Sequence, residues 1–389
     1  MTTDFDQVVD RAGTASLKWD FRTEKTGMAD ILPMWVADMD FPAPPEVIKA
    51  VKSRAAHGVY GYTGHPKSFF VATREWFRSV HNWEIKTDSI VVTPGVVPAI
   101  NLAIQTFTRP GDKVIIQPPV YYPFMWAIEN NKREIAFNPL VRTGDTWCMD
   151  LDDLERKIAS GARMLILCSP HNPVGRVWTR KELEGLTAIC RRHNILVLSD
   201  EIHADLVMSG HRHLPLEIVA PDLNERIITC TAPSKTFNLA GLQVSAIVIP
   251  DTELRRQFSG AMKSVGLGLS NPFGIVAAEA AYRHGHEWLK NLLAYISANH
   301  AYLVKFCRGS MPWARPMPLE GTYLAWLDCN AAGMDDEELT GRLRRNARVW
   351  LDEGPLFGPG GEGFQRMNLA CPRTILAEAL NRMAETMID

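Results

Sequence analysis

Residues 195–201 are Ile195-Leu196-Val197-Leu198-Ser199-Asp200-Glu201, an apolar run that ends in two acids. An unbroken run of this kind is typical of a strand buried on both faces of a parallel sheet. Similar runs predict further strands at residues 90–92, 114–116, 164–167, 227–229 and 244–249. Helical patterns lie between them, and the clearest begins at the capping box Thr179-x-x-Glu182. The sequence therefore predicts an α/β fold with a mainly parallel central sheet and helices on both faces.

The alternation of strands and helices changes from about residue 281 onward. A helical pattern at 287–306 leads to an alternating strand at 322–327, Asp335-x-x-Glu338 predicts another helix start, and a strand is predicted at 365–369. The 389 residues exceed the ~250–300 that one core usually serves. We therefore expect a large domain at 46–285 and a smaller α+β domain at 286–389, with an N-terminal segment, 1–45, packed on the smaller one.

Composition excludes several classes of function. A charged fraction of 22% with a formal net charge of −2 and no basic run predicts no nucleic-acid partner. The first residues lack the pattern of a signal peptide, and no apolar run is long enough to predict a membrane span. The seven cysteines are scattered without a C-x-x-C pair, which favours free thiols in a reducing compartment. We therefore expect a cytoplasmic protein.

Two patterns that could indicate other chemistry fail on their context. Residues 358–363 match G-x-G-x-x-G, but a strand is predicted after them where a dinucleotide site needs a helix. His211 and His213 have no third ligand at metal-binding spacing, so we expect them in a solvated loop and predict no metal site.

Polar or aromatic residues come directly after five of the predicted strands. They are Gly95, the pair Tyr121-Tyr122, Asn172, Asp200 and Lys235. In open α/β sheets, ligands bind outside the carboxyl ends of the strands, where such loops converge. The sequence therefore predicts one site formed by all five loops.

Lys235 and Asp200 each allow two interpretations. A surface position is the commonest one for a lysine, but Lys235 follows a buried strand, where partial burial would lower its pKa and make it a nucleophilic amine. Asp200 could form a structural ion pair or cap a helix, or it could pair with a cationic pyridinium nitrogen. His203 lies near the same site and could equally be a structural helix residue.

Two loops could bind the rest of a ligand. Prolines and a glycine constrain residues 169–175, which form either a simple tight turn or a loop that directs the Asn172 amide at a ligand. Gly95, Val96 and Val97 begin a helical run whose N–H groups and dipole suit a phosphate, although many loops between a strand and a helix look similar.

Five segments carry a resemblance to a known family. They are Trp35-Val36-Ala37-Asp38-Met39-Asp40-Phe41, Gly58-Val59-Tyr60-Gly61-Tyr62, residues 118–124, residues 199–205 and residues 232–242. With Asp200 and Lys235 they resemble the fold-type-I pyridoxal-phosphate enzymes of the aspartate aminotransferase superfamily, and more narrowly the cystathionine β-lyase/cystalysin-like C–S lyases. The resemblance runs from about residue 30 to the C-terminus.

The resemblance implies a role for each matching residue. Lys235 would form the Schiff base with pyridoxal phosphate and later move the Cα proton, and Asp200 would hold the pyridinium nitrogen. Asn172 would bond the phenolic oxygen, Tyr121 would stack on the ring, and His203 would lie beside the cofactor. The phosphate would be bound by Gly95, Val96, Val97 and Ser234, together with Tyr62 of a neighbouring subunit in a homodimer. Tyr60, in the same loop, is an alternative to Tyr62 for this contact. The substrate would be bound by Arg366, Ala37 and Tyr122, with the α-carboxylate on Arg366.

Two positions depart from the aminotransferases in the direction of the lyases. His203 stands where they usually have tyrosine, and Gln243 stands where they have a phosphate-binding arginine. The resemblance therefore implies β-elimination from an L-cysteine S-conjugate such as cystathionine, giving a thiol, pyruvate and ammonia. An aminotransferase, which needs the same residues, is one alternative. A regulatory protein that keeps the fold is another.

Overall fold

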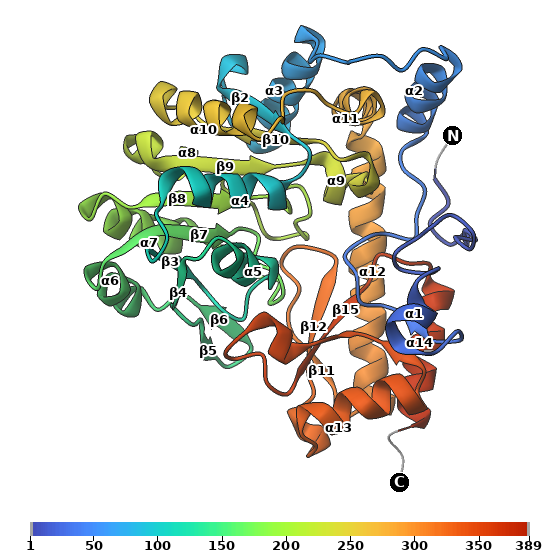
Figure 1. Cartoon of the computed structure of the whole chain (residues 1–389). Helices are drawn as coiled ribbons and strands as arrows, with labels where there is room; N and C mark the ends of the chain where they lie inside the picture. The colour runs from blue at the N-terminus through green and yellow to red at the C-terminus, as the bar shows by residue number, and fades with distance from the viewer. Residues whose placement is uncertain (1–2, 387–389) are drawn as a thin grey trace.

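A computed structural model describes residues 3–386 and contains one large, mixed sheet (Figure 1). Its seven strands are ordered β2 (Ile90–Thr93), β10 (Ser245–Val248), β9 (Ile227–Thr231), β8 (Leu196–Asp200), β7 (Ala162–Cys168), β3 (Lys113–Ile116) and β4 (Glu134–Phe137). Strands β9, β8, β7, β3 and β4 run parallel, whereas β10 is antiparallel to both of its neighbours. The predicted α/β fold with a mainly parallel sheet is confirmed. Strand β4 was not predicted.

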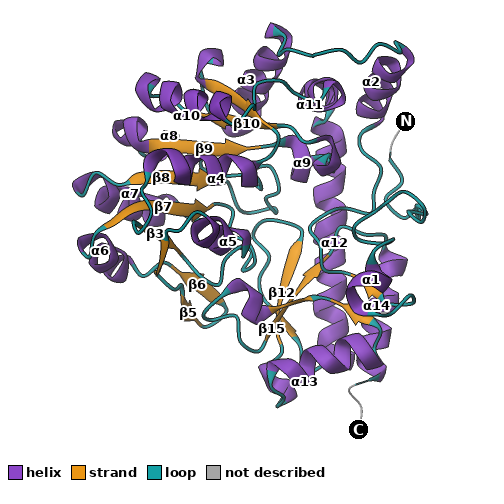
Figure 2. Cartoon of the chain, in the orientation of Figure 1, coloured by secondary structure: helices purple, strands orange, loops and turns teal. Residues whose placement is uncertain are grey.

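Helices cover both faces of this sheet (Figure 2). Alternate residues of a strand point to opposite faces, so Val197 and Leu198 of β8 belong to different core clusters. The cluster that contains Leu198 includes residues of α4 (Val96–Phe107), α5 (Pro123–Asn130) and α10 (Thr252–Ser264). The cluster that contains Val197 includes residues of α6 (Leu151–Ala159), α7 (Arg180–Arg192) and α8 (Leu216–Val219). This two-sided burial explains why the central strands are mostly apolar on both faces and not alternately apolar and polar.

The C-terminal region has a sheet of its own. It is antiparallel and ordered β11 (Arg315–Pro316), β12 (Leu324–Asp328), β15 (Phe364–Asn368) and β14 (Asp352–Glu353). The helices of this region are α12 (His286–Ser310), α13 (Asp336–Gly341) and α14 (Arg373–Glu385). The strand predicted at 322–327 begins later, at Leu324, because Thr322 has a left-handed backbone with φ of +69°.

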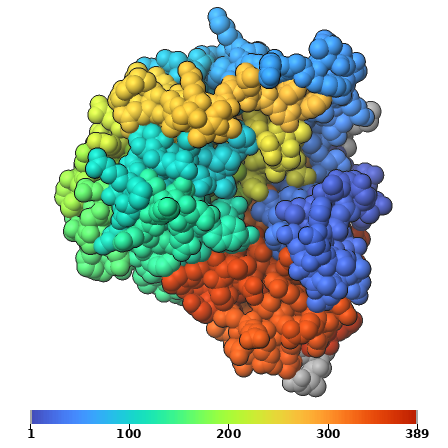
Figure 3. Space-filling view, viewed as in Figure 1, coloured from blue at the N-terminus to red at the C-terminus, as the bar shows by residue number. Residues whose placement is uncertain are grey.

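The N-terminal segment lies against this C-terminal region (Figure 3). Strand β1 (Leu32–Pro33) pairs in parallel with β13 (Val349–Trp350).

The remaining α-helices and strands are α1 (Arg22–Thr26), α2 (Pro45–Ala56), α3 (Lys67–His81), the hairpin of β5 (Val141–Thr143) and β6 (Thr146–Cys148), α9 (Pro233–Thr236) and α11 (Pro272–His284). Within residues 3–386, no helix combines the length and the apolar character that a membrane span requires.

The capping box predicted at Thr179 is present at the start of α7. The Thr179 hydroxyl accepts a hydrogen bond from the Glu182 N–H at 3.3 Å, and the Glu182 carboxylate accepts one from the Thr179 N–H at 2.8 Å. Two N–H groups that the helix itself leaves unpaired are thereby satisfied.

We expect Thr179→Ala to lower the free energy of unfolding by about 1 kcal/mol, because one helix N–H loses its acceptor. Urea denaturation of the purified chain measures this change. Thr179→Ser keeps the hydroxyl and should retain most of the stability. An equal loss in both variants would mean that the hydroxyl is not the source.

Candidate functional site

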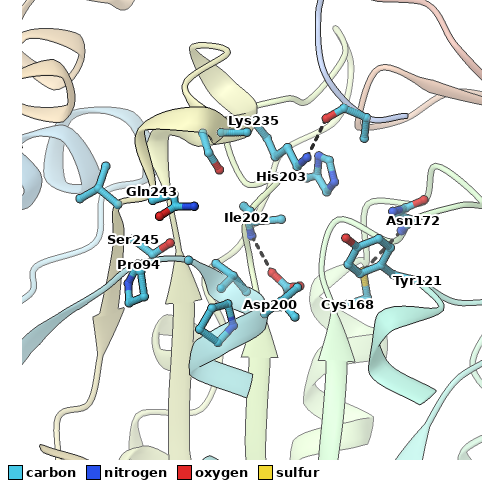
Figure 4. A pocket seen from close by; sticks show the side chains of 18 residues that line it. Pro94, Tyr121, Cys168, Asn172, Asp200, Ile202, His203, Lys235, Gln243 and Ser245 are labelled. Atoms are coloured by element: carbon cyan, nitrogen blue, oxygen red, sulfur yellow. Dashed lines mark hydrogen bonds between the residues drawn. The ribbon is translucent and has the colours of Figure 1, made fainter. Parts of the chain in front are cut away.

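A cavity of about 180 Å³ lies at the carboxyl ends of β7, β8 and β9 and at the start of α4 (Figure 4). Ten of the thirteen site residues predicted from the sequence line it: Ala37, Gly95, Val96, Val97, Tyr121, Asn172, Asp200, His203, Ser234 and Lys235. The loops that follow these strands thus converge, because the carboxyl ends of parallel strands lie at the same edge of the sheet. Three predicted residues, Arg366, Tyr122 and Tyr62, do not line it and are described below.

Lys235 lies on the short helix α9, which begins two residues after β9. Its Nζ donates a hydrogen bond to the main-chain oxygen of Ala37 at 2.6 Å. Burial and, to a smaller extent, Arg366 lower the pKa of this amine to about 8, while Asp38 and Asp200 oppose the shift. A lysine with this pKa has an appreciable neutral fraction near neutral pH, which nucleophilic attack and proton removal both require.

Asp200 ends β8 and is buried. Burial raises the pKa of its carboxyl to about 7, although the Ile202 N–H, which donates to Oδ1 at 3.1 Å, and Lys235 both lower it. A buried carboxylate of this kind is stabilised by a cationic partner. A protonated pyridine nitrogen is such a partner.

The start of α4 forms another wall of the cavity. Its N-cap is Gly95, which makes no side-chain capping bond, so the first N–H groups of the helix remain available to a ligand. A Cβ at Gly95 would come within 3.3 Å of the Pro98 ring. The Ser234 side chain also lines the cavity. Helix N–H groups with a nearby hydroxyl suit a phosphate.

His203 and Asn172 bring nitrogen groups to the same cavity. His203 lies in a turn after β8 and not in a helix, and burial, with Lys235 and Arg366, lowers its pKa to about 3. Its Nδ1 is buried without a hydrogen-bond partner in residues 3–386. Asn172 accepts a hydrogen bond from Arg366 Nη1 at its Oδ1, 3.0 Å away, which orients its Nδ2 donors for another partner.

Arg366 lies on β15, beside the cavity, and its side chain is buried. It donates to the Trp35 oxygen at 2.9 Å and forms an ion pair with Asp352. Its Nε has no partner among the described residues. The guanidinium lies 4.9 Å from the centre of the Phe357 ring. These contacts hold the guanidinium plane in one orientation.

Tyr121 and Tyr122 form an aromatic wall. Their ring centres are 5.5 Å apart, and Tyr122 is also 5.5 Å from Phe357. Burial raises the pKa of Tyr122 to about 12, with Asp352 adding to the rise and Arg366 opposing it. Burial also raises the pKa of Tyr121, so both hydroxyls are neutral at physiological pH and can only donate or accept hydrogen bonds.

Tyr62 does not line the cavity of its own chain, and 97% of its surface is exposed. Tyr60, in the same loop, is held within the chain, because its hydroxyl donates to the Ala55 oxygen at 2.6 Å. Its ring centre lies 5.7 Å from that of Phe273. Of the two tyrosines, Tyr62 is therefore the more exposed, whereas the hydroxyl of Tyr60 is engaged within its own chain.

Two features were not predicted from the sequence. The Tyr323 hydroxyl, in the predicted strand 322–327, donates a hydrogen bond to the Ala37 oxygen at 2.9 Å, and the charge of Asp38 raises the pKa of Lys235.

His213 was expected in a solvated loop, and this expectation is wrong. It is buried and bonded to Glu201 at 2.8 Å, because the buried Glu201 carboxylate needs partners. Among the described residues, no group of three or more His, Cys, Asp or Glu side chains could hold a metal ion.

The groups around the cavity fit pyridoxal phosphate, the cofactor expected from the sequence. Four groups face this cavity: the Lys235 amine with its lowered pKa, the buried Asp200 carboxyl, which forms no ion pair among the described residues, the start of α4, and the unpaired Nδ1 of His203. They match the aldehyde, the ring nitrogen, the phosphate and the remaining polar atoms of that molecule.

Comparisons with known proteins agree with this chemistry. Residues 29–383 match the family described as aminotransferase class I and II. Cystathionine beta-lyase PatB of Bacillus subtilis (strain 168) is 44% identical, over 97% of this chain and 98% of that protein. Protein MalY of Escherichia coli (strain K12) is 35% identical, over 97% of both. The crystal structure of cystalysin from Treponema denticola, which contains pyridoxal 5′-phosphate, has a TM-score of 0.96 and 37% identity and covers 99% of both chains.

The raised pKa of Asp200 predicts that this carboxylate destabilises the cofactor-free chain. The folded chain holds its proton up to a pKa of about 7, whereas the unfolded chain loses it near 3.8. The penalty therefore grows as pH rises from about 4 to about 7 and is constant above that range. We expect Asp200→Asn to raise the free energy of unfolding of the cofactor-free chain by about 2–4 kcal/mol at pH 8.

The gain should be smaller at pH 5, where the folded wild-type chain keeps the proton. Urea denaturation at the two pH values measures both gains. A variant that is no more stable than the wild type at pH 8 would contradict the assigned burial penalty.

Proposed function

This chain belongs to the aminotransferase class I and II family, and from that premise we propose that it is a pyridoxal-phosphate-dependent carbon–sulfur β-lyase. Its substrate would be an L-cysteine S-conjugate such as L-cystathionine, and its products a thiol, pyruvate and ammonia. The observation that carries the proposal is that the Lys235 amine and the Asp200 carboxylate face one cavity. The 44% identity to a cystathionine beta-lyase over nearly the whole chain supports the lyase reaction.

Each wall of the cavity would hold one part of the cofactor. Lys235 would hold it covalently, Asp200 would pair with the ring nitrogen, and Tyr121 would lie against the ring. Asn172 and His203 would contact the ring's polar edge, and the phosphate would bind the start of α4 with the Ser234 hydroxyl. When bound, pyridoxal phosphate supplies an electron sink for negative charge at the substrate Cα.

The protein's own groups would bind and deprotonate the amino acid. Arg366, fixed by Asp352 and the Trp35 oxygen, would attract the substrate carboxylate. Ala37 and Tyr122 would contact the rest of the substrate. Once the substrate amino group has taken the place of Lys235 on the cofactor, the freed Lys235 Nζ, with a pKa of about 8, would take the Cα proton. The β-thiolate would then leave.

Two residues favour a lyase over an aminotransferase, which was the first alternative. Gln243 lines the cavity where the aminotransferases have a phosphate-binding arginine, and His203 lines it where they usually have a tyrosine. In the lyases that the sequence resembles, both departures are expected.

The location and assembly of the protein are further parts of the proposal. All seven cysteines are unpaired, which favours a reducing compartment such as the cytoplasm. An exposed apolar surface formed by Val59, Tyr62, Val265 and Leu269 lies on two loops that the His65–Ser270 hydrogen bond joins at 2.7 Å. We propose that a second copy of the chain covers this surface and that Tyr62 then reaches the partner's phosphate site.

The purified protein should form pyruvate from L-cystathionine without any added keto acid, because elimination needs no amino-group acceptor. Lys235→Ala should lower kcat by about 10²–10⁴-fold, the range of a general base. Treating the loaded wild-type protein with borohydride should attach the cofactor permanently to Lys235, as peptide mass spectrometry can detect. Pyruvate formation that depends on a keto acid would identify an aminotransferase instead.

The shared site predicts recovery of activity when two inactive variants are mixed. Tyr62→Ala and Lys235→Ala chains form hybrid dimers in which one site carries both defects and the other carries neither. Activity should therefore return toward one functional site per hybrid after subunit exchange, which native mass spectrometry can follow. If exchange is complete, Tyr62→Ala alone is severely impaired and no activity returns, then Tyr62 serves its own chain.

A further inference from the structure

Residues 36–41 form a segment whose main chain is held from several sides. The Asn368 amide donates to the oxygens of Val36, at 2.8 Å, and Asp38, at 2.6 Å. The Asn238 amide donates to the oxygens of Met39, at 3.0 Å, and Phe41, at 2.9 Å. Asn368 lies two residues after Arg366, and Asn238 lies three residues after Lys235. The segment is thus tied to both sides of the site.

One carbonyl of this segment has a different partner. The Ala37 oxygen accepts hydrogen bonds from Lys235 Nζ, at 2.6 Å, and from the Tyr323 hydroxyl, at 2.9 Å. A carbonyl oxygen has two lone pairs, so these two donors saturate it. The position of this oxygen therefore sets the position of the Lys235 amine whenever that amine is free.

The N-terminal segment also contacts residues 36–41, through ion pairs and hydrogen bonds to Asp38 and Asp40. Arg11 donates two hydrogen bonds to the Asp38 carboxylate, at 2.9 and 3.0 Å, and one to Asp40, at 2.8 Å. The fully buried Lys18 donates to Asp40 at 2.6 Å, and Trp19 Nε1 donates to Asp40 at 2.8 Å. We call Arg11, Lys18 and Trp19, with Asp38 and Asp40, the N-terminal clasp.

Stability alone is a weak explanation for the clasp. Removing two buried charges from water costs about as much as their attraction returns, so buried ion pairs add little net stability. They do define geometry, because a displaced partner leaves a buried charge uncompensated. Burial alone would raise the pKa of Asp40, but Lys18, Trp19 and Arg11 keep it below its usual value, so the carboxylate stays ionised and the clasp stays closed.

We propose that the N-terminal clasp positions the Ala37 carbonyl as the acceptor that holds the free amine of Lys235. The inference rests on the proposed function, in which the substrate amino group displaces the lysine and the freed amine must then take the Cα proton. During that interval the Ala37 oxygen keeps Nζ within the cavity. Arg11, Lys18 and Trp19 are thus positioning residues that act through the 36–41 segment, at a distance from the reacting atoms.

Arg11→Met tests the proposal, because Arg11 is only partly buried and its loss spares Lys18 and Trp19. We expect kcat to fall about tenfold while KM changes less than twofold, because a misplaced base affects the chemical step. Amides of residues 36–41 should exchange hydrogen for deuterium faster in the full chain, with and without cofactor. Arg11→Lys keeps the charge but loses the fork, and it should recover part of kcat and of the protection.

Arg142→Met is the matched control. Arg142 forms a comparable ion pair with Asp328 at 2.7 Å, and its side chain is 28% exposed against 22% for Arg11. It should leave kcat and the exchange of residues 36–41 unchanged. An equal fall of kcat in both variants, an unchanged kcat in Arg11→Met, or a fall without faster exchange in 36–41 would each overturn the proposal.

The exchange measurement separates this proposal from the proposed function. A wild-type chain that forms no pyruvate from cystathionine would refute the lyase reaction. Normal exchange in Arg11→Met would refute the clasp, whatever reaction the wild type catalyses.

Discussion

The Ala37 oxygen accepts hydrogen bonds from Lys235 Nζ and from the Tyr323 hydroxyl, so that three distant parts of the chain meet at one atom. Lys235 lies on α9, directly after a strand of the large sheet. Ala37 belongs to the N-terminal segment, and Tyr323, the second donor to the same oxygen, belongs to the C-terminal region. A partly desolvated amine needs an acceptor, so each part must be in place for the amine to be held. The packing of the N-terminal segment on the C-terminal region, seen in the pairing of β1 with β13, provides that acceptor.

Burying the ionisable groups of the site lowers the free energy of unfolding of the chain. Asp200 is buried with a raised pKa, and Lys235 has a lowered one. The rise at Asp200 corresponds to about 4 kcal/mol against ionisation in the folded chain. The buried strands around these groups, which are apolar on both faces, supply the stability that tolerates this cost. A cationic ligand would offset the burial of Asp200, which ties the stability of the site to its occupancy.

Much of the site consists of main-chain groups. The start of α4 offers N–H groups to an anion, and the segment 36–41 offers the Ala37 carbonyl. Side chains around them, such as Asn238 and Asn368, act by fixing those main-chain groups. Residues outside the cavity, including Arg11 and Lys18, can therefore affect the groups that line it, because they fix the main chain that carries those groups.

The sequence by itself determined the sheet and the place of the site. Continuous apolar runs such as 195–198 mark strands buried on both faces, and the loops after parallel strands share one edge, so Asp200, Asn172 and Lys235 were predicted to meet there. Strand β4 escaped prediction because it lies at the sheet edge, where Glu134-Ile-Ala-Phe137 begins with an exposed charged residue and has only one buried residue. Only the tertiary structure decided that His213 is buried against Glu201 and that β10 runs antiparallel. It also decided that the Ala37 oxygen accepts a hydrogen bond from Lys235, 198 residues away in the sequence. Periodicity records which face of an element is buried, whereas a long-range contact to a main-chain atom leaves no pattern in the side chains.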